Sequence, residues 1–472
     1  MRDKPNILII MPDQFRADTM GCAGHPTVKT PNIDRLAQEG VRFTNAYTVS
    51  PICMSARASF VSGLYPHNHH IWNNAGSLPA HDETFFHHLQ ESGYYTAYVG
   101  KSHFYPHRAG EHLKDHEEYM RARGLNYVHE TTGPWATTRT ESYMTDRWRE
   151  LGLLSAFRED YRRRREIGPC AVWPSPLPEE EFLDSYIGRK AVEFVESYDG
   201  ENPVCLFVGF GGPHEPWDAP GRYATMYDPD EVPAPIPPSQ PGEWTPEYAA
   251  RKMKAGRIKG MTEQEVRKIR ASYYGKISLI DHWIGEILSA FQRRGWLEDA
   301  LILFWSDHGE MLGDHQRLHK SVFYESSAHV PLIIRYPGVI EGGKICDALV
   351  EIIDAYPTLL EAVGAKASER CLGRSLWPLL KGEREAHRDA VFSEVFTAGH
   401  YNLMVRTERH KYAMDDTGEG YMLFDLVDDP LERNNLIGHP EAREIEAELR
   451  ERALRFWVKN QTRYYRVGKE II

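Results

Sequence analysis

The stretch LILFWSDHGE, residues 301–310, joins a short apolar run to charged side chains that follow it directly. Leu301–Trp305 has the length and composition of a strand buried on both faces, which is typical of parallel sheets. Asp307 and His308 come immediately after it. Ligands in open parallel sheets bind beyond the carboxyl ends of the strands. The stretch therefore predicts an α/β fold with a site at one edge of its sheet.

Other short apolar runs alternate with helical patterns, as in proteins whose large, mostly parallel sheet is flanked by helices. The clearest helices are residues 31–39, with Thr30 as the N-cap, and residues 276–292, with one apolar stripe. The clearest strands are residues 7–11, 94–99, 204–210, 301–305 and 330–335. This alternation predicts one large α/β domain in the N-terminal part of the chain.

The pattern changes near residue 389, where short alternating segments surround the turn-rich run DDTGEG. This is typical of a small antiparallel sheet. A helical pattern follows over residues 440–459. Because 472 residues exceed the usual size of one compact core, we expect two parts. Residues 1–375 would form the α/β domain that carries the site, and residues 376–472 an α+β subdomain with a terminal helix and a tail.

Two segments, residues 107–180 and 218–265, fit neither pattern and are interpreted as insertions between strands. Such insertions commonly shape the pocket of an open α/β sheet. The polar and aromatic tail, which includes Tyr464 and Tyr465, is expected to pack at a subunit interface. The sequence therefore suggests a homo-oligomer.

The formal net charge of −12 argues against nucleic acid or an anionic membrane as a partner, because both would be repelled. The first apolar run, residues 7–11, is too short for a signal peptide or a membrane span, so we expect a cytoplasmic protein. The six cysteines show no paired spacing, which indicates neither a disulfide framework nor a zinc site. An anionic substrate would need local positive charge.

Several predicted strands end next to side chains that can carry chemistry, and the sheet should bring these side chains together. Asp13, Asp307 and His308 suit a divalent cation whose shell leaves room for a substrate oxygen. His103 and His214 titrate near neutrality and can move protons. These groups could therefore bind a substrate oxygen through a cation and transfer protons to or from the substrate.

Positive charge converges on the same edge of the sheet. Lys101, Lys320 and the forked guanidinium of Arg57 can hold a tetrahedral oxyanion, so the set suits a sulfate or phosphate ester. Cys53, four residues before Arg57, is the candidate nucleophile, and a helix that begins there would aim backbone N–H groups at an anion. A plain thiolate is a soft group beside a hard cation, which makes it a poor choice for this reaction.

These segments resemble the sulfatase family of the alkaline phosphatase superfamily, in which a C-x-P-x-R motif marks a cysteine that is oxidised to formylglycine. The matches follow one another in family order. The versions MPDQ and GKSHF are most similar to choline sulfatases and phosphonate monoester hydrolases. The matching segments are PNILIIMPDQ, TPNIDRLAQEGVRFTNAY, CMSARASFVSGLYP, YVGKSHF, PHEPW, WSDHGEMLGDH, HKSVFYESSAHVPLIIRYPG and LFDLVDDPLERNNL.

The resemblance implies an alkaline-phosphatase-like fold, a formylglycine-generating maturase as a partner, and a divalent cation. The usual ion is Ca²⁺, with Mn²⁺ as the alternative. The ligands implied are Asp13, Asp307, His308 and the modified Cys53, while Arg57 would steady the formylglycine.

The resemblance also implies roles for four further residues. Lys101 and His103 would match the pair that binds sulfate and handles the hydrated aldehyde, and His214 and Lys320 would lie on the leaving-group side. One hydroxyl of the hydrate attacks sulfur and the alcohol leaves. The second hydroxyl is then deprotonated, expels sulfate and restores the aldehyde. The implied reaction is hydrolysis of a small anionic sulfate monoester.

Two positions depart from the family pattern. Gln14 stands where many relatives carry a second acid, and Ser55 stands where the motif has proline. Cys53 could therefore be oxidised by the usual maturase, by another enzyme, or not at all. Two alternative functions stay open: a phosphonate monoester or phosphodiester hydrolase on the same scaffold, and a non-enzymatic metal-binding protein in which Cys53 remains a thiol.

Overall fold

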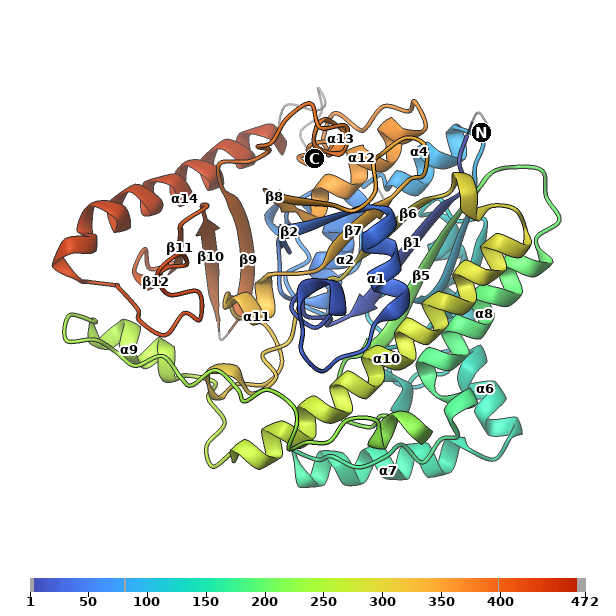
Figure 1. Ribbon diagram of the computed structural model, residues 1–472, viewed down its shortest axis with the longest axis horizontal. Coiled ribbons are helices and arrows are strands. Elements are labelled where there is room, and N and C mark those ends of the chain that lie inside the picture. Colours follow the sequence, from blue (N-terminus) through green and yellow to red (C-terminus); the bar gives the residue numbers. More distant parts are fainter. Residues whose placement is uncertain (1–3, 80–81, 398, 465–472) are drawn as a thin grey trace.

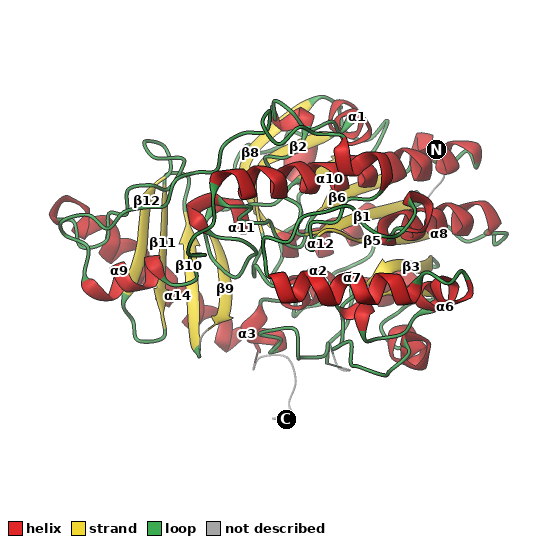
Figure 2. Ribbon diagram, turned by 90° about the horizontal axis from the view of Figure 1, so that it is seen from below, coloured by secondary structure: helices red, strands yellow, loops and turns green. Residues whose placement is uncertain are grey.

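The computed structural model describes residues 4–79, 82–397 and 399–464. A large sheet lies between two layers of helices, and a smaller sheet with one long helix packs beside it (Figure 1). Turned by 90°, the view separates the strands of the two sheets (Figure 2). The predicted α/β architecture with a smaller antiparallel sheet is confirmed.

The large sheet has eight strands in the order β4-β3-β5-β1-β6-β7-β2-β8. All neighbours run parallel except β7, which is antiparallel to both β6 and β2. In register, Ile7 of β1 lies opposite Cys205 of β5 and Leu301 of β6. The strands are β1 Ile7–Asp13, β2 Val41–Tyr47, β3 Tyr95–Lys101, β4 Tyr127–Thr131, β5 Val204–Pro213, β6 Leu301–Trp305, β7 Leu332–Arg335 and β8 Lys344–Glu351.

Both faces of the central strands are buried, as their continuous apolar runs predict. Along β1, Ile7 and Ile9 join one core, whereas Leu8 and Ile10 join the other. Helices α2, α4 and α12 share the first core, and α1, α8 and α10 share the second. Their bounds are α1 Pro31–Glu39, α2 Cys53–Ser62, α4 Phe85–Glu91, α8 Leu183–Ser197, α10 Glu263–Arg293 and α12 Ala355–Ala362.

The start of α1 is capped differently from the prediction. Thr30 holds the N-cap position, but its side chain makes no capping hydrogen bond. Instead, the backbone N–H groups of Asn32 and Ile33 donate to Asp281 of α10, at 3.0 and 2.8 Å. A carboxylate from a neighbouring helix thus satisfies the free amides that every helix start presents.

The two predicted insertions have more structure than expected. Residues 107–180 contain β4, which pairs with β3 as an edge strand, so this segment is partly sheet rather than only an insertion. Residues 218–265 contain α9 and the first residues of α10. None of the described helices is both long and apolar enough to cross a lipid bilayer. The remaining helices are α3 Pro66–His69, α5 Glu117–Arg121, α6 Tyr143–Glu150, α7 Leu154–Ile167, α9 Glu247–Lys254, α11 Glu325–Ala328 and α13 Trp377–Leu380.

The C-terminal sheet is antiparallel throughout, in the order β12-β11-β10-β9, and α14 packs on it. His67 of α3 joins it to the large domain, because Nδ1 contacts Glu394 Oε1 of β9 at 2.5 Å. The division at residues 375 and 376 stays a prediction, as does the interface role of the tail: Tyr465 and the side chain of Tyr464 lie outside the described residues. The elements are β9 Val391–Thr397, β10 His400–Arg406, β11 His410–Asp415, β12 Gly420–Asp425 and α14 Arg443–Tyr464.

Candidate active site

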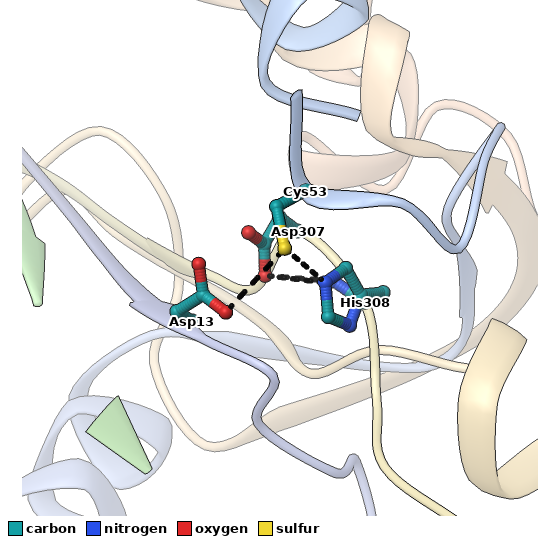
Figure 3. Close-up of side chains that lie close together, drawn as sticks. All are labelled: Asp13, Cys53, Asp307 and His308. Atoms are coloured by element: carbon teal, nitrogen blue, oxygen red, sulfur yellow. Dashed lines mark hydrogen bonds and ion pairs between the residues drawn. The ribbon is translucent and has the colours of Figure 1, made fainter. Parts of the chain in front are cut away.

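Four side chains meet at the carboxyl edge of the large sheet, as Figure 3 shows. Asp13 ends β1, Asp307 and His308 follow β6, and Cys53 is the first residue of α2. One ligand atom from each lies within 4.8 Å of the others, and all four residues are buried. The Cys53 Sγ atom is 3.0 Å from His308 Nε2 and 3.8 Å from Asp13 Oδ1.

Arg57 lies one helical turn after Cys53 in α2, so both side chains point to the same side of the helix. Its Nε donates to Asp307 Oδ2 at 2.8 Å, and its Nη2 donates to Asp13 Oδ2 at 3.2 Å. Its Nη1 donates to the backbone oxygen of Lys101 at 2.6 Å. The four-residue spacing of cysteine and arginine therefore lets one guanidinium fix the ends of three strands around residue 53.

The charges of this cluster shift several pKa values. Burial alone would raise the pKa of Asp13, but Lys101 and other cations outweigh it and hold that pKa well below its usual range. For Asp307, burial and the neighbouring Asp13 charge prevail and raise the pKa. Burial and Asp13 oppose ionisation of the Cys53 thiol, yet Lys101 and Lys320 lower its pKa well below the usual value. The cluster favours negative charge at residue 53.

The donor set suits a hard divalent cation. Asp13 Oδ1 faces Cys53, and the other oxygen of Asp13 is held by Arg57. His308 Nδ1 lies 2.9 Å from the Gly309 carbonyl oxygen, which assigns the proton to Nδ1 and leaves Nε2 free to coordinate. Burial lowers the pKa of His308, but Asp307 and Cys53 raise it to about 9, so a bound cation would displace a proton from this ring.

A second group of residues lies beside the cluster. Lys320 Nζ lies 2.7 Å from His214 Nε2 and also donates to Gln14 Oε1. Burial lowers the pKa of Lys320, but the charges of Cys53 and Glu215 raise it above its usual value. The two residues expected on the leaving-group side are thus in direct contact with each other.

The end of β3 supplies the remaining predicted residues. Lys101 Nζ contacts Asp13 Oδ2. His103 lies beside Cys53 and stacks on His107 with ring centroids 5.2 Å apart. Burial lowers the pKa of His103 to about 3, although its hydrogen bond with Cys53 acts in the opposite direction. His103 has a left-handed backbone, with φ of 55°, a conformation that costs free energy and is concentrated at functional sites.

Sequence reasoning missed a carboxylate pair next to this site. The side-chain amide of Gln14 donates to Glu215 Oε2 at 2.8 Å and to Glu310 Oε2. His319 Nδ1 lies 3.3 Å from Glu215 Oε1. Burial lowers the pKa of His319, but the charges of Glu215 and Glu310 raise it to about 9. Both glutamates occur within the matching segments PHEPW and WSDHGEMLGDH. The positions of Glu215 and Glu310 in the sequence did not predict that both would contact Gln14.

This geometry is accompanied by similarity to known proteins. The model of the family described as Sulfatase matches residues 5–365. The chain belongs to the sulfatase family. A second model, described as N-sulphoglucosamine sulphohydrolase, C-terminal, matches residues 313–459 of this sulfatase. The chain is accordingly a sulfuric ester hydrolase.

Relatives cover almost the whole sulfatase. It is 32% identical to an arylsulfatase of Clostridium perfringens over 93% of this chain and 92% of the relative. It is 31% identical to a choline-sulfatase of Rhizobium meliloti over 93% of this chain and 83% of the relative. The crystal structure of a phosphonate monoester hydrolase of Agrobacterium radiobacter superposes with a TM-score of 0.79 and 26% identity, covering 97% of this chain and 96% of the other. The alkaline-phosphatase-like fold is thereby confirmed.

Proposed function

We propose that this sulfatase hydrolyses sulfate monoesters to an alcohol and inorganic sulfate, with an oxidised residue 53 as the nucleophile. The observation that carries the proposal is the convergence of Cys53 with Asp13, Asp307 and His308. A thiol suits neither a hard cation nor clean release of sulfate. We therefore propose that a maturase converts Cys53 to formylglycine, whose hydrate offers two hydroxyl groups.

The proposed cation is Ca²⁺, with Mn²⁺ as the alternative. It would be held by Asp13, Asp307, His308 and residue 53, and it would supply Lewis-acid polarisation of the sulfate oxygens. Arg57 keeps the two carboxylates in place through its bonds to Asp13 and Asp307. Arginine and lysine side chains add the positive charge that a sulfate group needs.

Proton movements follow from the positions of three side chains. Lys320 Nζ, 2.7 Å from His214 Nε2, is the donor that we assign to the leaving alcohol oxygen. His103, beside residue 53, is the base that we assign to the second hydroxyl of the hydrate. Loss of that proton drives cleavage of the C–O bond, releases sulfate and restores the aldehyde.

The test combines the chemical state of residue 53 with the reaction. Protein purified from the native host is digested and analysed by mass spectrometry, with the peptide that carries buried Cys205 as an internal unmodified control. We expect an aldehyde mass at residue 53 and release of inorganic sulfate from an aryl sulfate. An unmodified residue 53 in protein that still releases sulfate would overturn the formylglycine mechanism.

A second candidate is hydrolysis of phosphonate monoesters, which is favoured by the close superposition on the phosphonate monoester hydrolase. Sulfate and phosphonate monoesters need similar cationic clamps and differ mainly in charge. Fully oxidised protein should be assayed with matched aryl sulfate and aryl phosphonate substrates. A kcat/KM that is higher for the sulfate supports the first proposal, and the opposite order supports the second.

A further inference from the structure

A cavity of about 610 Å³ opens beside the candidate active site. One wall is α9, a second is the segment 317–324, and a third is formed by strands of the C-terminal sheet. Lys320 belongs both to this lining and to the contacts around Gln14 and His214. The volume is in the range of pockets that hold small organic ligands. The cavity is therefore placed to receive the part of a substrate that lies beyond the reacting group.

The lining of this cavity is cationic. It includes Arg251, Lys252, Arg317 and Lys320, and no aspartate or glutamate occurs among the described residues that line it, although His400 of the lining contacts Asp416 outside it at 2.8 Å. This contrasts with the formal charge of −12 for the whole chain. A concave surface with one sign of charge concentrates ligands of the opposite sign.

Arg317 is the most informative of these cations. It is only 7% exposed, and its Nε is buried without a hydrogen-bond partner among the described residues. Nη2 donates to the Met253 carbonyl oxygen at 3.0 Å and the guanidinium also contacts the Tyr324 side chain, but Arg317 forms no ion pair with a carboxylate in the described part of the chain. Burial lowers its pKa. A buried charge without a counter-ion is costly, which indicates that an anion from outside the chain completes this site.

The other cations that line the cavity differ in whether a carboxylate of the chain already pairs with them. Lys252 is already paired, because its Nζ lies 2.5 Å from Asp415 Oδ2 and 4.9 Å from the centre of the Tyr421 ring. Arg251 is exposed at the rim of the cavity and has no ion-pair partner among the described residues. Tyr248 and Tyr421 add aromatic walls that suit the flat face of a ring. The two arginines are thus the cations that are available to a ligand.

We infer that this cavity binds the alcohol part of the substrate, and that this alcohol carries a second anionic group, a carboxylate or a sulfate, which pairs with Arg317 and Arg251. The inference rests on the proposed sulfate ester hydrolysis and names its substrate class. Arginine suits this role because its planar fork binds both carboxylate and sulfate through two parallel hydrogen bonds. A cationic alcohol such as choline is disfavoured by the same charges.

The test compares matched substrates. Fully oxidised protein is assayed with a neutral aryl sulfate, with the same aryl sulfate bearing a carboxylate, with the aryl disulfate, and with choline sulfate. We expect kcat/KM for at least one dianionic substrate to exceed that for the neutral ester by about tenfold or more, since one charge-assisted contact has this size. The better of the two dianions identifies the second group. A ratio near one, or a preference for choline sulfate, overturns the inference.

Two variants locate the effect. In Arg317→Met and Arg251→Met the ratio of kcat/KM for the dianionic to the neutral ester should fall about tenfold. Arg251 is exposed, so its variant keeps the test decisive if Arg317→Met does not fold. Lys254→Met, at an exposed position of α9 outside the cavity lining, is the matched control and should leave both substrates unchanged. An unchanged ratio in Arg251→Met and in folded Arg317→Met overturns the inference.

The failure of this inference can be separated from the failure of the proposed function. Binding of the carboxylated and the neutral aryl sulfate to Cys53→Ala protein is measured by calorimetry, which needs no turnover. Tighter binding of the dianion supports the cavity assignment even if no sulfate ester is cleaved. Equal binding overturns the assignment, whereas failure of fully oxidised protein to cleave any sulfate ester overturns the proposed function.

Discussion

Two buried clusters in this sulfatase contain the same kinds of side chain, namely two carboxylates, one arginine and histidine. The first is the candidate active site. The second lies where β8 ends and contacts the start of the C-terminal sheet through Phe392. We call it the scaffold cluster, and its members are Glu351, Asp354, His387 and Arg388.

The carboxylates of the scaffold cluster have partners on every oxygen. Glu351 Oε1 accepts from the Phe392 amide at 2.7 Å, and Oε2 accepts from the Tyr65 hydroxyl at 2.5 Å. Asp354 Oδ2 accepts from Arg388 Nε at 3.0 Å, and Oδ1 accepts from a backbone amide at 2.7 Å. Burial opposes ionisation of Asp354, but Arg388 lowers its pKa below the usual value. This cluster is complete without a ligand.

The carboxylate oxygens of the active-site cluster also have hydrogen-bond partners, and Asp307 Oδ1, for example, accepts from the backbone amide of Gln14 at 3.0 Å. What distinguishes this cluster is that one ligand atom each from Asp13, Cys53, Asp307 and His308 lies within 4.8 Å of the others. The composition of the two clusters is alike, but Glu351, Asp354 and His387 of the scaffold cluster do not bring their ligand atoms within 4.8 Å of one another. The convergence of ligand atoms, rather than the kinds of residue present, therefore separates the candidate site from the scaffold cluster.

The largest expected effect is the loss of turnover in Cys53→Ala. Removal of a nucleophile lowers kcat by about 10⁴-fold or more, while loss of one buried sulfur should cost only about 1 kcal/mol of stability. Sulfate release and urea unfolding measure the two quantities. Cys205→Ala, at a buried cysteine of β5, is the matched control and should keep its activity. Retained turnover in Cys53→Ala would place the nucleophile elsewhere.

Arg388→Met, in the scaffold cluster, should lower stability and leave activity unchanged. The substitution leaves the buried negative charge of Asp354 without its arginine partner. Removal of one partner of a buried ion pair lowers the free energy of unfolding by about 3–5 kcal/mol. Activity per folded molecule should stay the same. Urea unfolding checks the value, with Arg384→Met at an exposed position as control. A loss below about 1 kcal/mol would show that the cluster contributes little to stability.

Calcium should distinguish the two clusters directly. Addition of Ca²⁺ at about 100 times its Kd should stabilise the native protein by about 2.7 kcal/mol, and a chelator should reverse this. Asp307→Asn should abolish the shift, whereas Asp354→Asn should lower stability and keep the shift. Thermal unfolding with and without Ca²⁺ measures both. An equal Ca²⁺ effect in the two variants would contradict the assignment of the ligands.

The smallest effect is expected at the border of the active site. Gln14→Glu replaces an amide that donates to Glu215 and Glu310 by a third carboxylate. Loss of these bonds should cost about 1–3 kcal/mol at pH 8. We expect repulsion by Glu215 and Glu310 to outweigh the attraction of Lys320 and to raise the pKa of the new carboxyl in the folded state, so the loss should shrink as the pH falls towards 5. Gln240→Glu, at an exposed position, is the control in urea unfolding. An equal loss at both pH values would exclude charge repulsion.

The central strands could be predicted because both of their faces are buried. β1, β5 and β6 are buried at every position, so each reads as an uninterrupted apolar run with a clear end. The rule that ligands bind beyond the carboxyl ends of parallel strands then brought Asp13, His214 and Asp307 into one site before the geometry was known. The structure does bring them together.

Other elements gave no such signal. β8 begins with exposed residues, and β2 mixes buried and half-buried positions, so neither shows a continuous apolar run. Glu215 and Glu310 both contact the side chain of Gln14, which has a left-handed backbone, with φ of 67°, directly after β1. The cationic cavity joins α9 to residue 317 and to β10, a contact between distant segments that local sequence patterns do not encode.

The burial of α2 also bears on the order of events when the protein is made. All ten residues of this helix are buried, and Ser55 Oγ donates to the Ile71 carbonyl oxygen at 2.6 Å. A second enzyme that reads the peptide around Cys53 could reach it only while that peptide is still extended. If Cys53 is oxidised as we propose, oxidation must then compete with folding, and chains that fold first would keep a thiol at residue 53 that a maturase supplied later cannot reach.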